Sequence, residues 1–238
     1  MQREVGLERL NSFHLDACNQ HYIVNYFLFA DIKAVVSKFA KGNTLDIGCG
    51  NKPYEALFKN VATNYIGCDI MQSHQNVVDV ICPATKLDFD NNTFDTVFST
   101  QVIEHVENHQ AMVFEASRVL KTNGIAIFTI PFCWELHEEP YDFFRFSKYG
   151  IKYLFEKNGF EIVQIKPNGG KWAATLQTLL NTIFSVRKYK TFRAFVIKHL
   201  FITLKFIWVY NKFSVWIDKK YFDEGLTLNY IVVAKKNA

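Results

Sequence analysis

Apolar residues recur at intervals of three and four in residues 22–40, "YIVNYFLFADIKAVVSKFA". This spacing predicts an amphipathic helix, and Lys38 and Lys41 stand near its C-terminal end, where the helix dipole favours cations. Further along the chain, short apolar runs that predict strands alternate with helical patterns. The predicted strands are 43–48, 63–68, 76–80, 94–100, 124–130, 160–166 and about 226–235, and the predicted helices are about 53–60, 105–120 and 147–158. Such alternation implies a mainly parallel sheet with helices on both faces.

Turn residues mark two of the predicted helix ends. In "KTNGIAIFTIP", Asn123 and Gly124 predict the end of a helix, and Pro131 ends the alternating, β-branched strand that follows. The stretch "KNGFEIV" repeats this chemistry at Asn158 and Gly159. The chain of 238 residues shows no internal repeat, so we expect one α/β domain with additions rather than two independent domains.

The composition is typical of a folded protein in a reducing compartment. Hydrophobic residues make up 49% of the chain, which argues against disorder. The five cysteines, Cys18, Cys49, Cys68, Cys82 and Cys133, form no CxxC pair, and their odd number argues against a closed disulfide framework. The charged N-terminus and the short apolar runs predict neither a signal peptide nor a membrane-spanning helix. We therefore expect a cytoplasmic protein.

Charge is distributed unevenly along the chain. Residues 171–221 hold ten Lys and Arg and one acid, a net charge of +9, whereas the rest of the chain carries −5. A nucleic-acid binder is usually basic throughout, so we expect no nucleic-acid partner. Lys198, Lys205 and Lys212 are seven apart, which places them on one face of a helix beside a wide apolar side. Three functions stay open for this segment: a lid over the substrate, a homodimer interface, or a peripheral membrane contact.

The candidate chemistry begins at "TLDIGCGNKPY", where a buried strand ends in a glycine turn. Gly48 and Gly50 allow a sharp bend and a close ligand approach, although turn geometry alone would also explain them. A dinucleotide fingerprint would continue with a third glycine, but Pro53 occupies that position. Asp46 next to the turn is a poor neighbour for pyrophosphate and a good one for a sulfonium or an amino group.

Two more segments follow at the ends of predicted strands. "NYIGCDIM" ends in Asp69, which is suited to accept hydrogen bonds from both hydroxyls of a ribose, or to act as a turn residue. "KLDFDNNTFDTVFSTQVIEHV" contains a loop, a strand and a predicted helix that carries Glu104 and His105.

Taken with "SRVLKTNGIAIFTIPF" and "YLFEKNGFEIV", these segments resemble class I S-adenosylmethionine-dependent methyltransferases of the type 11 group over about residues 43–166. The resemblance implies S-adenosyl-L-methionine as cofactor and a three-layer, Rossmann-like, seven-stranded sheet with an antiparallel last strand. On this basis we expect an N-terminal helical segment at 1–42, a methyltransferase domain at 43–170 and 222–238, and a helical insertion at 171–221.

The resemblance also implies roles for individual residues. Asp46, Gly48 and Gly50 would line the methionine end of the cofactor, Asp69 would bind the ribose, Leu87 and Asp88 would flank the adenine, and Gln101 would lie near the reacting centre. Two positions depart from the usual pattern: Lys52 replaces a glycine, and Pro83 stands where an acid often meets the adenine amino group. "GCGNKPY" is similar to a subgroup associated with bacterial surface glycans.

For the general base we expect His105 or His137, because both follow strands whose ends open on the cofactor side. Local hydrogen bonding alone would also explain either histidine. Some related O-methyltransferases bind a divalent metal through an E-x-x-E-H pattern and a later histidine, which here corresponds to Gln101, Glu104, His105 and His137. Gln101 lacks the charge of the first carboxylate, so we favour a site without metal and keep metal assistance as an alternative.

These patterns together predict a methyltransferase acting on a small-molecule or glycan hydroxyl in surface polysaccharide biosynthesis. In "HEEPYDFFRFS", aromatic residues would form a platform for a sugar ring, and Asp142 and Arg145 would bind hydroxyls or pair with each other. The alternatives are a methyltransferase for a quinone-like hydrophobic molecule and a non-catalytic cofactor-binding scaffold.

Overall fold

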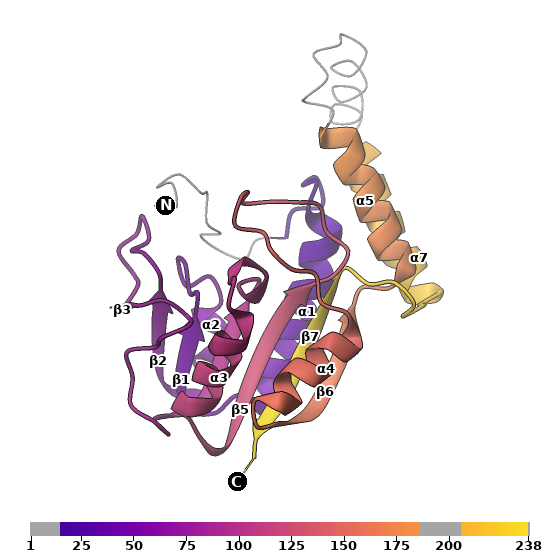
Figure 1. The fold of residues 1–238 in the computed structure, drawn as a ribbon. Coiled ribbons are helices and arrows are strands. Elements are labelled where there is room, and N and C mark those ends of the chain that lie inside the picture. The colour runs from indigo at the N-terminus through magenta and orange to yellow at the C-terminus, as the bar shows by residue number, and fades with distance from the viewer. Residues whose placement is uncertain (1–14, 186–205, 238) are drawn as a thin grey trace.

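The computed structural model describes residues 15–185 and 206–237, and these form a mixed sheet with helices on both faces (Figure 1). The strands are β1 (Gly42–Ile47), β2 (Ala62–Asp69), β3 (Val80–Ile81), β4 (Phe94–Thr100), β5 (Leu120–Pro131), β6 (Phe160–Asn168) and β7 (Asn229–Lys236). Their order in the sheet is β3-β2-β1-β4-β5-β7-β6. β7 runs antiparallel to β5 and β6, and the other pairs are parallel. The predicted seven-stranded, Rossmann-like sheet with an antiparallel last strand is confirmed.

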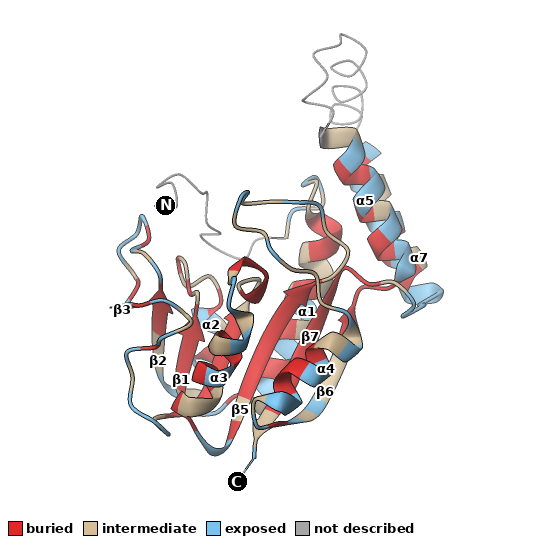
Figure 2. Cartoon of the chain, viewed as in Figure 1, coloured by how far each residue is buried: buried red, intermediate tan, exposed pale blue. Residues whose placement is uncertain are grey.

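Helices cover the two faces of the sheet with separate apolar clusters. On one face, α1 (Tyr22–Phe39) and α2 (Glu55–Phe58) pack on the sheet through a cluster that includes Ile32 and Phe58. On the other face, α3 (His109–Val119) and α4 (Lys148–Lys157) pack through a larger cluster that includes Met112 and Phe155. The inner strands β1, β4, β5 and β7 are mostly buried, whereas β2 and β6 are partly exposed (Figure 2), as expected for strands covered on both faces by helices.

Two further helices stand between β6 and β7, within the predicted insertion. α5 (Lys171–Ser185) and α7 (Phe206–Lys220) lie side by side and extend away from the sheet (Figure 1). A third apolar cluster joins their base to the start of α1. Of the three lysines predicted to share a helical face, Lys212 lies on α7, whereas Lys198 and Lys205 fall outside the described residues.

The predicted strand at 76–80 is wrong in extent, because only Val80 and Ile81 pair with β2. The preceding residues form a loop in which Asn76 has a φ of 54°. A left-handed residue of this kind turns the chain and interrupts strand geometry. β3 is therefore a short edge strand, and the loop before it borders the ligand side of the sheet.

The predicted helix at about 105–120 is wrong at its start and right to within one residue at its end, although the expected stop residues do not end it. Its first turn is a separate 3-10 turn, η1 (Ile103–His105), and α3 starts later because the Asn108 side chain caps it by accepting from the Ala111 amide. The helix ends at Val119 rather than at Asn123 and Gly124, because β5 already begins at Leu120. By contrast, α4 ends as predicted, at Asn158 with Gly159 in a left-handed conformation.

Candidate active site

A cavity of about 1310 Å³ opens where β1, β2 and β4 end at the same edge of the sheet. Six of the predicted site residues line it: Asp46, Gly48, Gly50, Asp69, Gln101 and His105. Three others, Leu87, Asp88 and His137, do not line it. The carboxyl ends of parallel strands are where open α/β sheets bind ligands, so this cavity is the candidate active site.

The glycine turn forms the floor of the cavity. Gly48 has a φ of 74°, and a Cβ built on it would lie 2.4 Å from Val102 Cγ2, so a larger residue would be both strained and crowded. The amides of Gly48 and Cys49 donate to the Cys68 carbonyl at 2.8 and 3.0 Å, which ties the turn to the end of β2. The turn is therefore held by backbone hydrogen bonds of the neighbouring strand.

Lys52 points away from the cavity. Its ammonium pairs with Asp79 in the loop before β3, and its side chain passes close beneath Gly67 of β2. Lys52 itself has a φ of 52°, a conformation in which glycine would ordinarily be favoured. The residue that replaces the third glycine thus links the turn to the second strand and leaves the cavity open.

Asp46 is a buried carboxyl at the cavity wall. It is 3% exposed and accepts a hydrogen bond of 2.5 Å from the Tyr65 hydroxyl. Burial is the main cause that raises the pKa of Asp46 to about 7, assisted by the nearby Asp69 carboxylate and opposed by the Tyr65 hydrogen bond. A cation bound in the cavity would stabilise the ionised form of this group.

Asp69 and Gln101 stand at the ends of neighbouring strands. One oxygen of Asp69 accepts from the Gly50 amide at 3.1 Å, and the other accepts from the Met71 amide at 3.4 Å. Gln101 has a φ of 54°, and its side-chain amide donates to Thr129 Oγ1 at 3.1 Å. A left-handed backbone at a non-glycine residue destabilises the fold by about 1–3 kcal/mol. The surrounding structure must offset this strain to keep Gln101 at the cavity.

Leu87 and Asp88 do not line the cavity: Leu87 is buried and Asp88 is exposed. The Leu87 side chain belongs to the main apolar cluster, and its amide donates to Glu115 Oε2 at 2.7 Å. The cavity is lined on this side by Cys82, Pro83, Ala84 and Thr85. The structure therefore brings the loop after β3 to the site, but not through the two side chains that the sequence pointed to.

Hydrogen bonding fixes the tautomer of His105. Nδ1 of His105 lies 2.9 Å from the Tyr141 carbonyl oxygen. A carbonyl can only accept, so Nδ1 carries the proton and the lone pair of the neutral ring is on Nε2. The ring is 8% exposed and lines the cavity. His105 is thus a buried imidazole at the cavity wall whose Nε2 can accept a proton.

His137 meets His105 from the loop after β5, with the two ring centroids 4.7 Å apart. Asp142 orients it by accepting from its backbone amide at 3.1 Å and by lying 3.2 Å from its Nδ1. Arg145 in turn donates to both Asp142 oxygens at 2.6 Å. Burial acts to raise the pKa of Asp142, but the Arg145 and His137 hydrogen bonds outweigh it and lower the pKa to about 2. The Asp142–Arg145 pair is thus internal to the loop.

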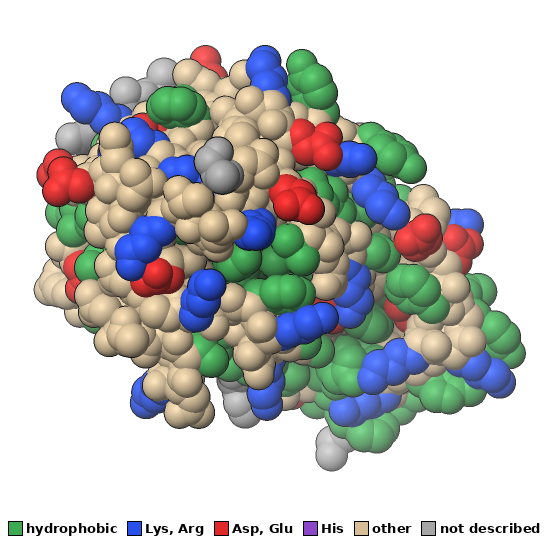
Figure 3. Space-filling model, turned by 90° about the horizontal axis from the view of Figure 1, so that it is seen from below, with side chains coloured by type: hydrophobic (Ala, Val, Ile, Leu, Met, Phe, Trp, Pro, Cys, Tyr) green, Lys and Arg blue, Asp and Glu red, His purple; other side chains and the backbone are tan. Residues whose placement is uncertain are grey.

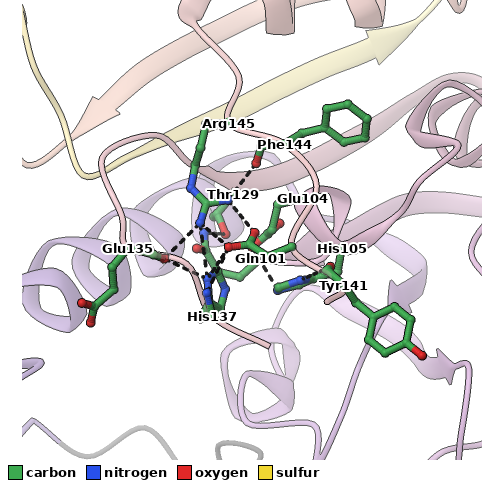
Figure 4. A network of polar contacts seen from close by, with 10 residues as sticks. Gln101, Glu104, His105, Thr129, Glu135, His137, Tyr141, Phe144 and Arg145 are labelled. Atoms are coloured by element: carbon green, nitrogen blue, oxygen red, sulfur yellow. Dashed lines mark hydrogen bonds and ion pairs between the residues drawn. The ribbon is translucent and has the colours of Figure 1, made fainter. Parts of the chain in front are cut away.

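Glu104 is fully buried beside the two histidines, with one oxygen 3.7 Å from His105 Nε2. Neither carboxylate oxygen accepts a hydrogen bond from another described residue, and burial raises the pKa of Glu104 to about 8. One possible ligand atom from each of Glu104, His105 and His137 lies within 4.8 Å of the others, which suits a divalent cation. Gln101, the fourth residue of the metal alternative, lies in the same region (Figure 4).

Two residues of α1, Asn25 and Leu28, line the cavity and were not predicted. Tyr141 and Phe143 also line it from the loop after β5, and they belong to the aromatic segment that the sequence suggested as a sugar platform. Asn25 is a polar residue in the otherwise apolar stretch "YIVNYFLF", a signal that would have marked it. Nothing in the sequence pairs α1 with the loop after β5, because their proximity depends on the packing of α1 against the sheet.

Comparisons with known proteins agree with this geometry. Residues 45–128 match the family described as "Methyltransferase domain". The chain is 29% identical to an uncharacterized protein of Methanocaldococcus jannaschii, over 67% of this chain and 79% of that protein. It is also 26% identical to the ubiquinone biosynthesis O-methyltransferase of Rickettsia typhi, over 42% of this chain and 46% of that enzyme. The chain therefore spans less than half of the latter relative.

Two solved structures illustrate the similarity in fold. The [4+2]-cyclase SpnF has a TM-score of 0.58 at 18% identity, covering 89% of this chain and 82% of its own. The phosphoethanolamine N-methyltransferase 2 of Haemonchus contortus, solved in complex with S-adenosyl-L-methionine, has a TM-score of 0.51 at 16% identity, with 92% and 58% covered. At these identities the likeness concerns the fold alone.

The sheet order and the cavity at the ends of β1, β2 and β4 agree with the methyltransferase domain that residues 45–128 match. The matched domain supports an S-adenosylmethionine-dependent methyltransferase, with S-adenosyl-L-methionine as its cofactor. The cavity fits this cofactor chemically, because buried carboxylates border it where a sulfonium, an amino group and ribose hydroxyls require acceptors.

Proposed function

We propose that the chain transfers a methyl group to a hydroxyl of a small-molecule or glycan acceptor, with a sugar hydroxyl of a surface polysaccharide precursor as the favoured substrate. The observation that carries this proposal is the orientation of His105. Its Nδ1 donates to the Tyr141 carbonyl, so its Nε2 is the basic nitrogen of an imidazole that lines the cavity. A hydroxyl acceptor must lose a proton during methylation, and this nitrogen is suited to take it.

In the cofactor half of the cavity, Asp46 and the glycine turn would hold the methionine end, and Asp69 would accept hydrogen bonds from the ribose hydroxyls. Ala84 and Thr85, rather than the Leu87 side chain, would flank the adenine, since both line the cavity. When bound, S-adenosyl-L-methionine supplies a methyl group activated by a sulfonium. The fixed turn and the strained Gln101 favour a preorganised site, and orientation of this kind supplies about 7–11 kcal/mol of a barrier.

His137 would assist His105 rather than contact the cofactor. Its Nδ1 lies 3.2 Å from an Asp142 oxygen and 3.3 Å from the Glu135 carbonyl oxygen, both acceptors, and 3.4 Å from Arg145 Nη2, a donor. The two shorter contacts favour the proton on Nδ1, which leaves Nε2 as the accepting nitrogen. Its ring contact with His105 would then support the base. A general base contributes roughly 10²- to 10⁴-fold in rate.

The acceptor would enter beside the loop after β5. Tyr141 and Phe143 line the cavity next to His105, and Glu138 lines it with a φ of 52°. Aromatic rings beside a carboxylate suit a sugar ring, which presents C–H groups on its faces and hydroxyls at its edge. This combination supports the glycan acceptor over a wholly apolar one.

The direct test is mass spectrometry of candidate acceptors after incubation with cofactor carrying an isotopically labelled methyl group. Nucleotide-linked sugars and lipid-linked oligosaccharides form one panel, and quinols and other phenols form the other. Label on a sugar oxygen supports the proposal. Label only on phenols would establish the quinone-like alternative, which is motivated by the similarity to a ubiquinone biosynthesis O-methyltransferase. Cofactor binding without label on either panel would favour the non-catalytic scaffold.

A metal-assisted variant of the same reaction is favoured by one observation, the grouping of Glu104 with both histidines. The buried Glu104 carboxylate would gain a counter-charge from a bound divalent ion, which would orient and acidify the acceptor hydroxyl. Titration of Mg²⁺ and Zn²⁺ by calorimetry tests this variant. Binding to the parent that Glu104→Gln abolishes would support it, and no binding to the parent would exclude it.

A further inference from the structure

The helices α5 and α7 carry an apolar surface that faces solvent. Large hydrophobic side chains with exposed fractions of 42–55% define what we call the hairpin surface: Trp172, Leu179, Phe206, Trp208, Val209, Phe213, Trp216, Tyr221 and Phe222. Three of the four tryptophans in the chain are among them. Figure 3 shows hydrophobic side chains interspersed with Lys and Arg at the lower right of the molecule, with acidic side chains above them at the right edge. Contiguous exposed apolar surface of this kind marks an interaction site.

α7 leaves large aromatic side chains in water although it buries another face. Its inward face buries the apolar Ile207 and Val215 together with three polar residues, Asn211, Ser214 and Asp218, each 0% exposed. The Asn211 amide donates to the carbonyls of Ala17 and Asn19 at 2.9 Å. The outward face of α7 carries Phe213 and Trp216, which are 49% and 51% exposed. Such a helix gains free energy when its outward face meets an apolar phase.

The charge of the hairpin surface indicates what this phase is. Lys212, Lys219 and Lys220 are exposed on α7. Lys212 and Lys219 donate to the hydroxyls of Tyr22 and Tyr26 on α1, and Lys220 lies over the Trp216 ring. The only acid on either described helix is Asp218, which is buried and accepts hydrogen bonds from the amides of Gly170 and Ala173. The exposed charge of the two helices is therefore positive, and of the two exposed acids that follow α7, Asp223 is paired with Lys171.

The hairpin surface could pack over the substrate as a lid, pair with a second copy of the chain, or bind a membrane, and the observations distinguish these three. No described residue of α5 or α7 lines the cavity, which argues against a lid. A second copy would bring its own α7 lysines toward these, and like charges oppose such an interface. An anionic membrane suits all features, because tryptophan and tyrosine partition to the lipid headgroup region and lysines attract acidic lipids. No described helix is long and apolar enough to cross a bilayer.

We propose that the hairpin surface docks the protein on an anionic membrane surface, with α7 lying in the interface. Phe213 and Trp216 enter the acyl boundary, and the α7 lysines contact the headgroups. This proposal rests on α5 and α7 alone and does not depend on the identity of the methyl acceptor.

The test uses the full chain and two kinds of vesicle, phosphatidylcholine alone and phosphatidylcholine mixed with phosphatidylglycerol. The protein is expected to float with the mixed vesicles, and to be released by high salt. Brominated lipids provide a second measurement on the unaltered chain, because Trp172, Trp208 and Trp216 dominate its tryptophan fluorescence. Quenching of most of this fluorescence supports the proposal, and unchanged fluorescence with no flotation overturns it.

Matched variants localise the contact. Phe213→Glu is expected to reduce vesicle partitioning at least about tenfold, whereas Phe114→Glu, at a Phe of α3 that is 57% exposed, is expected to leave it unchanged. Loss of one lysine charge in Lys220→Ala corresponds to about fivefold weaker binding, and Lys33→Ala on α1 is the control. Circular dichroism verifies that each variant is folded.

Equal losses in Phe213→Glu and Phe114→Glu would overturn the proposal. So would a dimer seen by sedimentation that Phe213→Glu dissociates while neither vesicle binds the parent, since the hairpin surface would then be an interface between copies.

Discussion

Cofactor affinity is expected to depend on pH through Asp46. Burial raises the pKa of this carboxyl to about 7 in the protein without cofactor, so near neutral pH it is partly protonated. If the sulfonium or amino group of the cofactor binds next to the ionised form, a proton and the cofactor compete for Asp46. The apparent Kd of the cofactor is then multiplied by 1 + 10^(pKa − pH), in which the pKa is that of Asp46 in the protein without cofactor.

With a pKa of about 7, this factor is about 11 at pH 6 and about 1.1 at pH 8, so the cofactor binds about tenfold more weakly at the lower pH. The sign follows from the raised pKa, since lowering the pH through 7 removes the negative charge that the cation needs. Isothermal titration calorimetry across this range measures the effect.

Asp46→Asn is the matched control, because an asparagine oxygen can still accept the hydrogen bond from the Tyr65 hydroxyl. This variant is expected to bind weakly and with a flatter pH profile. Glu104 also titrates near this range, at a pKa of about 8, but it is the same in both proteins. If the parent and Asp46→Asn showed the same slope between pH 6 and 8, Asp46 would not contact the cofactor cation and the reasoning would fail.

Three further predictions concern single residues. Asp69→Ala should weaken cofactor binding by calorimetry without unfolding the protein, because its carboxylate stands at the cavity edge and accepts from the local amides of Gly50 and Met71; unchanged affinity would remove it from the site. His137→Ala should lower turnover by about 10²-fold or more while cofactor affinity changes little, with the exposed His74→Ala as control; full activity would exclude a role as base or partner. In metal-free protein, Glu104→Gln should raise the free energy of unfolding above pH 5. The pKa of Glu104 is raised to about 8 in the folded protein, so as the pH rises toward 8 the carboxyl ionises in the unfolded chain first and the folded protein loses stability. Denaturant titrations at pH 5 and 8 check this, and an equal difference between the two proteins at both values would contradict it.

Local patterns in the sequence predicted most of the strands. They failed where the bounds of a strand depend on its pairing with a neighbouring strand. β4 begins at Phe94 and ends at Thr100, as predicted, because its apolar residues Phe94, Val97 and Phe98 are fully buried in the sheet. The run at 76–80 was also predicted as a strand, yet only its last residue, Val80, pairs with β2, since an edge strand has one neighbour and local turns compete with it. Leu120 joined β5 rather than α3 because it pairs with Phe94, a contact that local helix propensity does not encode.

The same division holds in the active site. The sequence by itself determined the glycine turn, Asp46 and Asp69, because each stands at a strand end and parallel strands end at one edge of the sheet. Only the tertiary structure decided that Lys52 turns beneath β2, that Leu87 enters the core, and that the loop after β5 brings His137 against His105. These outcomes depend on which side chains meet across elements far apart in the chain, and hydrophobic periodicity carries no information about such meetings.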